Sequence, residues 1–209
     1  MSTNLWPFKK RVFSQRMHID EQDFTEELGN ALLSQCQRSS SKELVVACIG
    51  TDRSTGDALG PILGSMLIEQ NLHHFTVYGT LAEPLHAVNL ETRLGIIHLA
   101  HPNAFLIAVD ACLGRQVNVG SITLSNRTLK PGAAMGKTLP EVGDCSLTGV
   151  VNVAGLMDFH TLQSTRLHEV MCMAEKMSTL FTFADRHLQQ EQVPLKKHTS
   201  LFKKKGMSF

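Results

Sequence analysis

The stretch at residues 50–61, with the sequence GTDRSTGDALGP, constrains the fold of this chain more than any other. It directly follows an apolar run at residues 44–49 and leads into residues 58–70, where apolar side chains recur at helical spacing. A buried strand that ends in a glycine-bearing loop and continues as a helix places the polar groups of the loop at the carboxyl edge of a sheet. Open α/β folds usually bind their ligands at this edge, so we expect the chemistry of the protein near residues 50–61.

Two acids of this loop and one acid beyond it are candidate site residues. Asp52 and Asp57 lie in the loop, and Asp110 follows a second apolar run at residues 105–109. If the two strands are neighbours, Asp57 and Asp110 face one another. Like charges a few ångströms apart cannot both ionise cheaply, so one carboxyl keeps a proton while the other acts as a base. One acid and one base around a water form a hydrolytic arrangement.

Two other interpretations of these acids stay open. Asp57 also suits the cap of the helix that follows it, and Asp110 suits a polar stop to a buried strand. Alternatively, two carboxylates hold a divalent cation, and an added imidazole would favour zinc or nickel. His98 and His101 share a helical spacing, but Pro102 ends such a helix, so neither stands out as a ligand. We therefore predict no metal site.

The order of the apolar runs predicts the fold class. We expect strands at residues 44–49, 75–79, 105–109, 117–124 and 147–153, and helices at residues 20–36, 58–70, 88–98 and 167–188. Asp20 suits the N-cap of the first helix. The β-α-β-α-β order of the first three strands argues for parallel pairing with helices on both faces, and the fourth strand fits an antiparallel or edge position. The prediction is a three-layer α/β/α fold with a mainly parallel central sheet and a mixed edge.

Length and charge limit the number of domains and the kinds of partner. With 209 residues, 43% of them hydrophobic, the chain is long enough for one domain with a core of its own. We predict a single domain at residues 18–190, an N-terminal arm at residues 1–17 and a basic, flexible tail at residues 191–209. The formal net charge of +1 gives no global field that would draw the chain to nucleic acid or anionic lipid.

Cysteine usage and the apolar segments indicate the compartment. The five cysteines are an odd number, lie far apart and include no C-x-x-C pair, which fits free thiols in a reducing cytoplasm. The start of the chain has no continuous apolar signal region, and no uncharged apolar stretch reaches the length of a membrane span. We expect a cytoplasmic protein without a membrane partner.

The loop at residues 130–144 is the second candidate site segment. It holds two prolines and three glycines, and a loop this long in a compact domain is more often functional than idle. Cys145 follows it without a neighbouring histidine, and the chain has neither a G-x-S-x-G elbow nor a phosphate-binding G-K-S/T. A nucleophilic cysteine is therefore a minor alternative, and no cofactor is expected.

Four elements in the same order resemble the core of the bacterial spore germination protease family. They are residues 50–61, ending in Asp-Ala-Leu-Gly-Pro, then Val-Asp-Ala at 109–111, Ile-Thr-Leu-Ser at 122–125, and Lys-Pro-Gly-Ala-Ala-Met-Gly-Lys at 130–137. The resemblance covers roughly residues 44–158, and the length and tails are closer still to short sporulation relatives of that protease. It implies a phosphorylase/hydrolase-like α/β fold, shared with hydrogenase maturation proteases, and an aspartic-type peptidase site.

Carried over to this chain, the resemblance implies catalytic roles for Asp57 and Asp110. It also implies that the glycine-rich segment borders a substrate cleft. The predicted cleft residues are Asp52, Gly56, Pro131, Gly132, Gly136 and Lys137. The germination protease is a considerably longer chain made as a zymogen, whereas this one shows no obvious propeptide and lacks room for extra substrate-gripping regions.

The resulting prediction is a sporulation-associated, aspartic-type endopeptidase of the cytoplasm of the sporulating cell or spore. Its partner would be a protein or peptide substrate, with small spore proteins as candidates; no specific nucleic acid is expected, and a homo-oligomer is left open. Two alternatives from other classes stay open. One is a non-catalytic protein that binds or regulates a spore protein on the same scaffold, and the other is a metal-dependent maturation peptidase.

Overall fold

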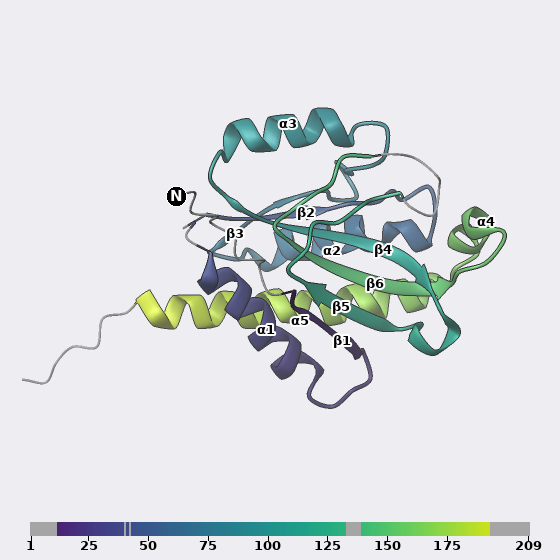
Figure 1. Ribbon diagram of the computed structural model, residues 1–209, viewed down its shortest axis with the longest axis horizontal. Helices are drawn as coiled ribbons and strands as arrows, with labels where there is room; N and C mark the ends of the chain where they lie inside the picture. Colours follow the sequence, from purple (N-terminus) through teal and green to yellow (C-terminus); the bar gives the residue numbers. More distant parts are fainter. Residues whose placement is uncertain (1–11, 40, 42, 133–138, 193–209) are drawn as a thin grey trace, which may run out of the picture.

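A six-stranded sheet lies at the centre of the molecule (Figure 1), and the computed structural model describes residues 12–39, 41, 43–132 and 139–192. The strands are β1 (Ser14–His18), β2 (Leu44–Cys48), β3 (Phe75–Tyr78), β4 (Phe105–Gly114), β5 (Ser121–Ser125) and β6 (Cys145–Val153). The helices are α1 (Phe24–Arg38), α2 (Leu59–Gln70), α3 (Leu90–Ala100), α4 (Asp158–Gln163) and α5 (Leu167–Gln192). Short 3-10 turns occupy Gly56–Ala58 and Gln116–Asn118.

The sheet has the order β1-β5-β6-β4-β2-β3 and is parallel at its centre. β2 pairs in parallel with β3 and β4, and β4 pairs in parallel with β6. β5 pairs antiparallel with both β6 and β1, so the mixed pairing is confined to one edge. Every residue of β2 is buried, as expected for a parallel strand covered on both faces.

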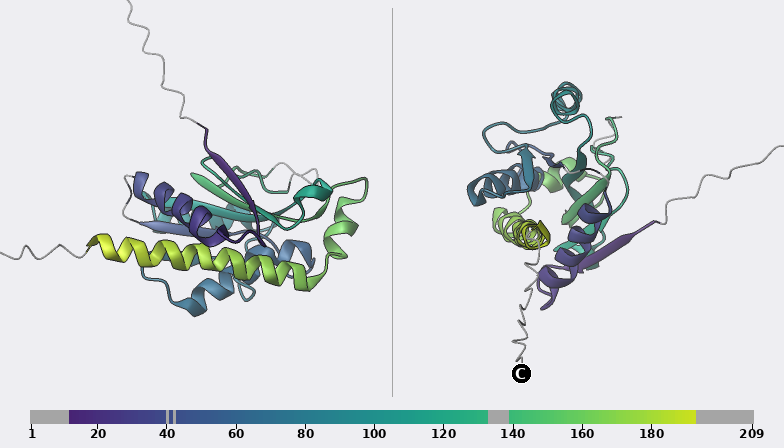
Figure 2. Two further views of the ribbon diagram at one scale, coloured as in Figure 1. Left: turned by 90° about the horizontal axis from the view of Figure 1, so that it is seen from below. Right: turned by 90° about the vertical axis from the view of Figure 1, so that its left-hand side faces the viewer.

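Helices cover both faces of this sheet, as the views in Figures 1 and 2 show. On one face, Leu90 and Leu94 of α3 pack in a cluster with Val45 of β2 and Leu106 of β4. The other face carries α1, α2 and α5. The predicted three-layer α/β/α fold with a mainly parallel sheet and a mixed edge is confirmed.

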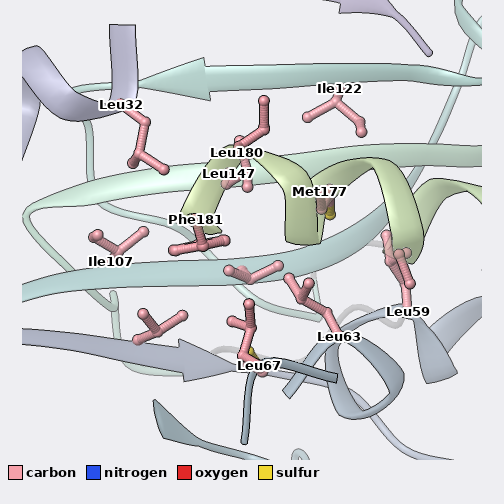
Figure 3. Close-up of a cluster of buried hydrophobic side chains, with 14 of the residues drawn as sticks. Leu32, Leu59, Leu63, Leu67, Ile107, Ile122, Leu147, Met177, Leu180 and Phe181 are labelled. Atoms are coloured by element: carbon pink, nitrogen blue, oxygen red, sulfur yellow. The ribbon is translucent and has the colours of Figure 1, made fainter. Parts of the chain in front are cut away.

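The larger core lies between the sheet and the three helices of the second face. Figure 3 shows side chains of α2 and α5, among them Leu63 and Phe181, meeting Ile107 of β4 and Leu147 of β6. These four side chains are fully buried. Burying a side chain of this size contributes about 1.5–3 kcal/mol each, so this layer anchors the strands that lead to the carboxyl edge of the sheet.

The start of the chain differs from the prediction. Residues 14–18 form the edge strand β1, although the sequence assigns residues 1–17 to an arm. β1 pairs with β5, about 107 residues further on, where Arg16 lies opposite Thr123. A local pattern carries no information on so distant a partner.

The first helix begins later than predicted. α1 starts at Phe24 after Asp23, and Asp20 does not cap it. The reason is a turn in which the Glu21 N–H donates to the His18 carbonyl oxygen at 3.1 Å and thereby delays the helix. The prediction of Asp20 as the N-cap is therefore wrong.

Further differences from the prediction lie in the second half of the chain. β4 continues through Gly114, beyond the apolar run that predicts it. The six-residue helix α4 is absent from the prediction, because so short a segment shows no helical period. In the part of the chain that the structure describes, no helix is long and apolar enough to cross a membrane. The predicted tail lies almost wholly outside the described residues, apart from residues 191 and 192, which end α5.

Candidate active site

A cavity of about 540 Å³ lies at the carboxyl ends of β2 and β4. Its walls come from the loop after β2, the continuation of β4, the loop at residues 86–88, residues 129–132 and α4. Both Asp57 and Asp110 line it. This is the edge of the sheet that the sequence indicates as the site of the chemistry.

Gly50 folds the loop after β2 back onto the end of the strand. It has a φ of +147°, and a Cβ on it would lie 2.0 Å from the carbonyl oxygen of Asp57. The Thr51 N–H donates to that same oxygen at 3.1 Å, and the Gly50 N–H donates to the Leu85 carbonyl at 2.8 Å. Only glycine permits this approach, so the residue is required to bring Asp57 to the strand end.

Asp57 lies half-buried on the 3-10 turn Gly56–Ala58. Burial raises the pKa of its carboxyl, and the Ser54 hydroxyl offsets this in part. The Ser54 hydroxyl is itself buried, with no hydrogen bond of normal geometry among the described residues. The residue before α2 is Ala58, and no side chain caps that helix, so the interpretation of Asp57 as a helix cap is wrong.

Asp110 lies where β4 extends past the end of β2. Val109 pairs with Cys48, the last residue of β2, and the next residue of β4 is opposite Thr148 of β6. The Oδ1 atom of Asp110 accepts a hydrogen bond of 2.9 Å from the Ala111 N–H. Because the strand continues beyond Asp110, the interpretation of this residue as a polar strand stop is also wrong.

The two carboxyls are electrostatically coupled. Burial raises the pKa of Asp110 to about 8, the Ala111 N–H opposes that rise, and the charge of Asp57 adds to it. At neutral pH the cavity therefore favours a protonated Asp110. One acid and one base in the same cavity are the groups that a hydrolytic reaction needs.

The predicted cleft residues divide into three groups. Pro131 and Gly132 line the cavity. Asp52 is exposed and does not line it, because the loop turns its outer residues to solvent, and Gly56 packs against Leu162 of α4 instead. Placing Asp52 and Gly56 in the cavity wall is therefore a wrong prediction. The last two predicted residues, Gly136 and Lys137, lie outside the described residues.

His86 lines the cavity and is absent from the sequence prediction. Its Nδ1 atom accepts a hydrogen bond of 3.3 Å from the Val88 N–H, so the neutral ring carries its proton on Nε2. The Asn89 Oδ1 accepts from the His86 N–H at 2.9 Å and fixes the backbone. His86 belongs to the loop after β3, a parallel strand, so the rule that drew attention to residues 50–61 applies to this loop as well.

Other charged groups complete the cavity wall. Arg53, Lys130 and Asp158 line it, and the Lys130 Nζ lies 2.9 Å from the Glu141 carboxylate. The sequence gives little signal for these residues, because each comes from a loop or from the short helix α4. The wall is thus of mixed charge around the central acid pair.

The alternative chemistries find little support in the geometry. His101 lies 2.7 Å from the Tyr78 hydroxyl and also contacts Glu43, far from the cavity. Among the described residues no group of three or more His, Cys, Asp or Glu side chains is placed to hold a metal ion. Cys145 is buried at the start of β6 rather than in a loop, and burial raises its pKa to about 12, which disfavours a thiolate.

Comparison with known proteins places the chain in a family. The fold is similar to a hydrogenase 3 maturation protease, at 17% identity and a TM-score of 0.42, over 67% of this chain and 89% of that one. It is also similar to the [NiFe] hydrogenase maturation protease HycI of Thermococcus kodakarensis KOD1, at 16% identity and a TM-score of 0.42, over 72% and 99% of the two chains. In sequence, 197 residues are 45% identical to the uncharacterized protein YyaC of Bacillus subtilis (strain 168), covering 93% of this chain and 96% of that protein. The chain belongs to the family described as "Protein of unknown function (DUF1256)", whose model matches residues 16–180.

Proposed function

We propose that this protein is an aspartic-type endopeptidase in which Asp57 and Asp110 activate a water molecule for attack on a peptide bond. The observation that carries the proposal is the coupled acid pair: both carboxyls line one cavity, and burial together with the charge of Asp57 raises the pKa of Asp110 to about 8. Perturbed acids in a cleft are typical of catalytic sites.

The roles follow from the two environments. Asp57 is assigned as the base, because the Ser54 hydroxyl opposes the rise in its pKa, whereas the charge of Asp57 adds to the rise in the pKa of Asp110. It takes a proton from water as the water oxygen attacks the carbonyl carbon, while protonated Asp110 gives its proton to the carbonyl oxygen. When the tetrahedral intermediate collapses, the C–N bond breaks, Asp57 passes its proton to the leaving amine, and a proton returns from the diol to Asp110.

The substrate class is a protein or peptide. The cavity has a volume of about 540 Å³ and a wall that mixes apolar residues with the acid pair, which suits a short stretch of chain. The resemblance of residues 50–61 and 109–111 to the spore germination protease supports peptide hydrolysis and a role in sporulation, with small spore proteins as candidate substrates.

The experiment compares the unaltered protein with Asp57→Asn and Asp110→Asn on a proteome extracted from spores, with new peptide termini identified by mass spectrometry. We expect termini from the unaltered protein and a loss of at least about a thousandfold in rate for either variant. Asp52→Asn is the matched control, because this exposed aspartate belongs to the same loop but lies outside the cavity wall.

Circular dichroism must show that each variant is folded before its rate is compared. Full cleavage by folded Asp57→Asn or Asp110→Asn would remove the proposal. If the folded unaltered protein produces no new termini, with or without added divalent metal, the non-catalytic binding protein becomes the better account. Termini that require added metal would instead favour the metal-dependent maturation peptidase.

A further inference from the structure

Three large apolar side chains of the α4 segment are exposed to solvent. The exposed fractions are 106% for Leu156, 61% for Met157 and 51% for Phe159. Single exposed apolar residues are ordinary, but several within four positions form a patch that marks an interaction site. Figure 1 shows α4 at one end of the molecule, away from the helices that cover the two faces of the sheet.

Other residues of the same segment belong to the cavity. Asp158 and Leu162 line the cavity, and Leu162 is 4% exposed. Leu162 packs on Gly56, where an added Cβ would lie 2.8 Å from the Leu162 Cδ2 atom. Gly56 directly precedes Asp57. The segment at residues 156–162 therefore presents apolar side chains to solvent and packs Leu162 against the turn that carries the proposed base.

Hydrogen bonds hold this helix in place. The Asn152 side-chain amide donates to the Thr165 hydroxyl at 3.2 Å and to the Thr161 carbonyl at 3.4 Å, which ties β6 to α4 and the residues after it. The Gly155 N–H donates to the Asp158 carboxylate at 2.7 Å and closes the turn before the helix. The apolar patch is thus fixed relative to the acid pair, as a docking surface requires.

We propose that the exposed apolar patch formed by Leu156 and Met157, which directly precede α4, and by Phe159 in its first turn docks an apolar segment of the protein whose chain occupies the cavity. The inference rests on the proposed function, because the occupant is the substrate itself. Continuity carries it: the patch and the cavity wall belong to one short segment, because Asp158 lies between Met157 and Phe159 in the chain and lines the cavity. Docking would therefore engage the part of the substrate that flanks the cleaved bond.

The test measures binding without cleavage, in the Asp57→Asn/Asp110→Asn background. The probe is fluorescently labelled β-casein, an extended protein with apolar segments, and a Gly-Ser peptide serves as the polar counterpart; anisotropy gives the Kd. We expect Leu156→Ser/Met157→Ser/Phe159→Ser to raise the Kd for β-casein at least tenfold. Ile96→Ser/Leu99→Ser on α3 removes apolar side chains that are 51% and 86% exposed and should leave the Kd within twofold.

Each outcome decides the inference. An unchanged Kd in the α4 variant, an equal loss in the α3 variant, or no binding of β-casein to the parent would overturn it. If sedimentation shows a dimer that the α4 substitutions dissociate, the patch is an interface between copies and the inference is also wrong. Binding that depends on α4, without cleavage by the unaltered protein, would sustain the docking surface and remove only the hydrolytic proposal.

Discussion

An aspartate lies near each of the two ends of the sheet, Asp185 buried and Asp110 half-buried, and the two have very different surroundings. Asp185 of α5 is 4% exposed and lies at the amino end of β3. Its carboxylate accepts hydrogen bonds from the N–H groups of His73 and His74 at distances of 2.8 to 3.2 Å, and the His74 Nδ1 lies 3.1 Å away. This carboxylate is surrounded by donors.

Asp110 lies at the other end, beyond the carboxyl end of β2. It accepts one backbone hydrogen bond from the adjacent Ala111. The charge that raises its pKa further is that of another acid, Asp57. Donors stabilise a buried carboxylate, whereas burial beside a like charge leaves a carboxyl that holds and releases a proton near neutral pH. The same residue type thus stabilises the fold at one end of the sheet and, in the proposed function, acts as an acid at the other.

The largest effect that would test this contrast is a loss of stability at Asp185. Asp185→Ala should lower the free energy of unfolding by about 3 kcal/mol, because it removes the acceptor of the N–H groups of His73 and His74 and the partner of the His74 ring. Urea unfolding followed by circular dichroism measures the change. Asp185→Asn keeps one acceptor oxygen and should lose clearly less, so equal losses in the two variants would contradict the role of the donors.

The next prediction concerns Asp110 and the pH dependence of cleavage. Because Asp110 must be protonated and its pKa is about 8, kcat/KM should fall about tenfold per pH unit above 8, or about a hundredfold by pH 10. The acid limb should lie above the ordinary value of 3.8, because the pKa of Asp57 is raised. A rate that stays flat to pH 10 in the folded protein would show that Asp110 is not the acid.

A smaller effect should appear in the free energy of unfolding, because Asp110 titrates. In the folded chain the pKa of Asp110 is raised from 3.8 to about 8, so its contribution to stability is fully present below pH 4 and is lost as the pH rises to 8. Asp110→Asn has no such titration and should therefore gain on the order of 2 kcal/mol relative to the unaltered protein between pH 6.5 and pH 8.5. Unfolding in urea at both pH values measures it. The same gain in Asp52→Asn would indicate a general charge effect.

Much of the fold can be predicted from the sequence, because the inner strands are recognisable as apolar runs. β2 is apolar throughout and is followed by a glycine-bearing loop and a helical period, which predicts a buried strand of a parallel sheet. β1 and α4 could not be predicted from the sequence, for two different reasons. β1 depends on a partner over a hundred residues away in the chain, and α4 is too short to show a period.

The site follows from the sequence only in part. Asp110 comes directly after an apolar strand segment, and Asp57 ends the loop that follows the neighbouring one, so parallel pairing brings both to one edge of the sheet. Asp52 carries the same signal five residues earlier but faces solvent, because the direction of a loop side chain depends on turns that Gly50 and Gly56 set. His86 has no motif around it, and only the direction of the loop after β3 brings it into the cavity.

The smallest expected effect comes from substituting the histidine near each aspartate, His74 beside Asp185 and His86 in the cavity of Asp110. The His74 ring is hydrogen-bonded to Asp185. In contrast, no hydrogen bond joins the His86 Nε2 to any described residue, so the N–H of this ring is available to an oxygen of the substrate. His86→Leu should therefore lower kcat/KM about tenfold, or about 1.4 kcal/mol, with little change in stability. His86→Gln keeps an N–H donor and should recover most of the rate. If both His86 variants lose the same activity, or if a folded His74→Gln variant loses as much, donation by His86 is not part of the reaction.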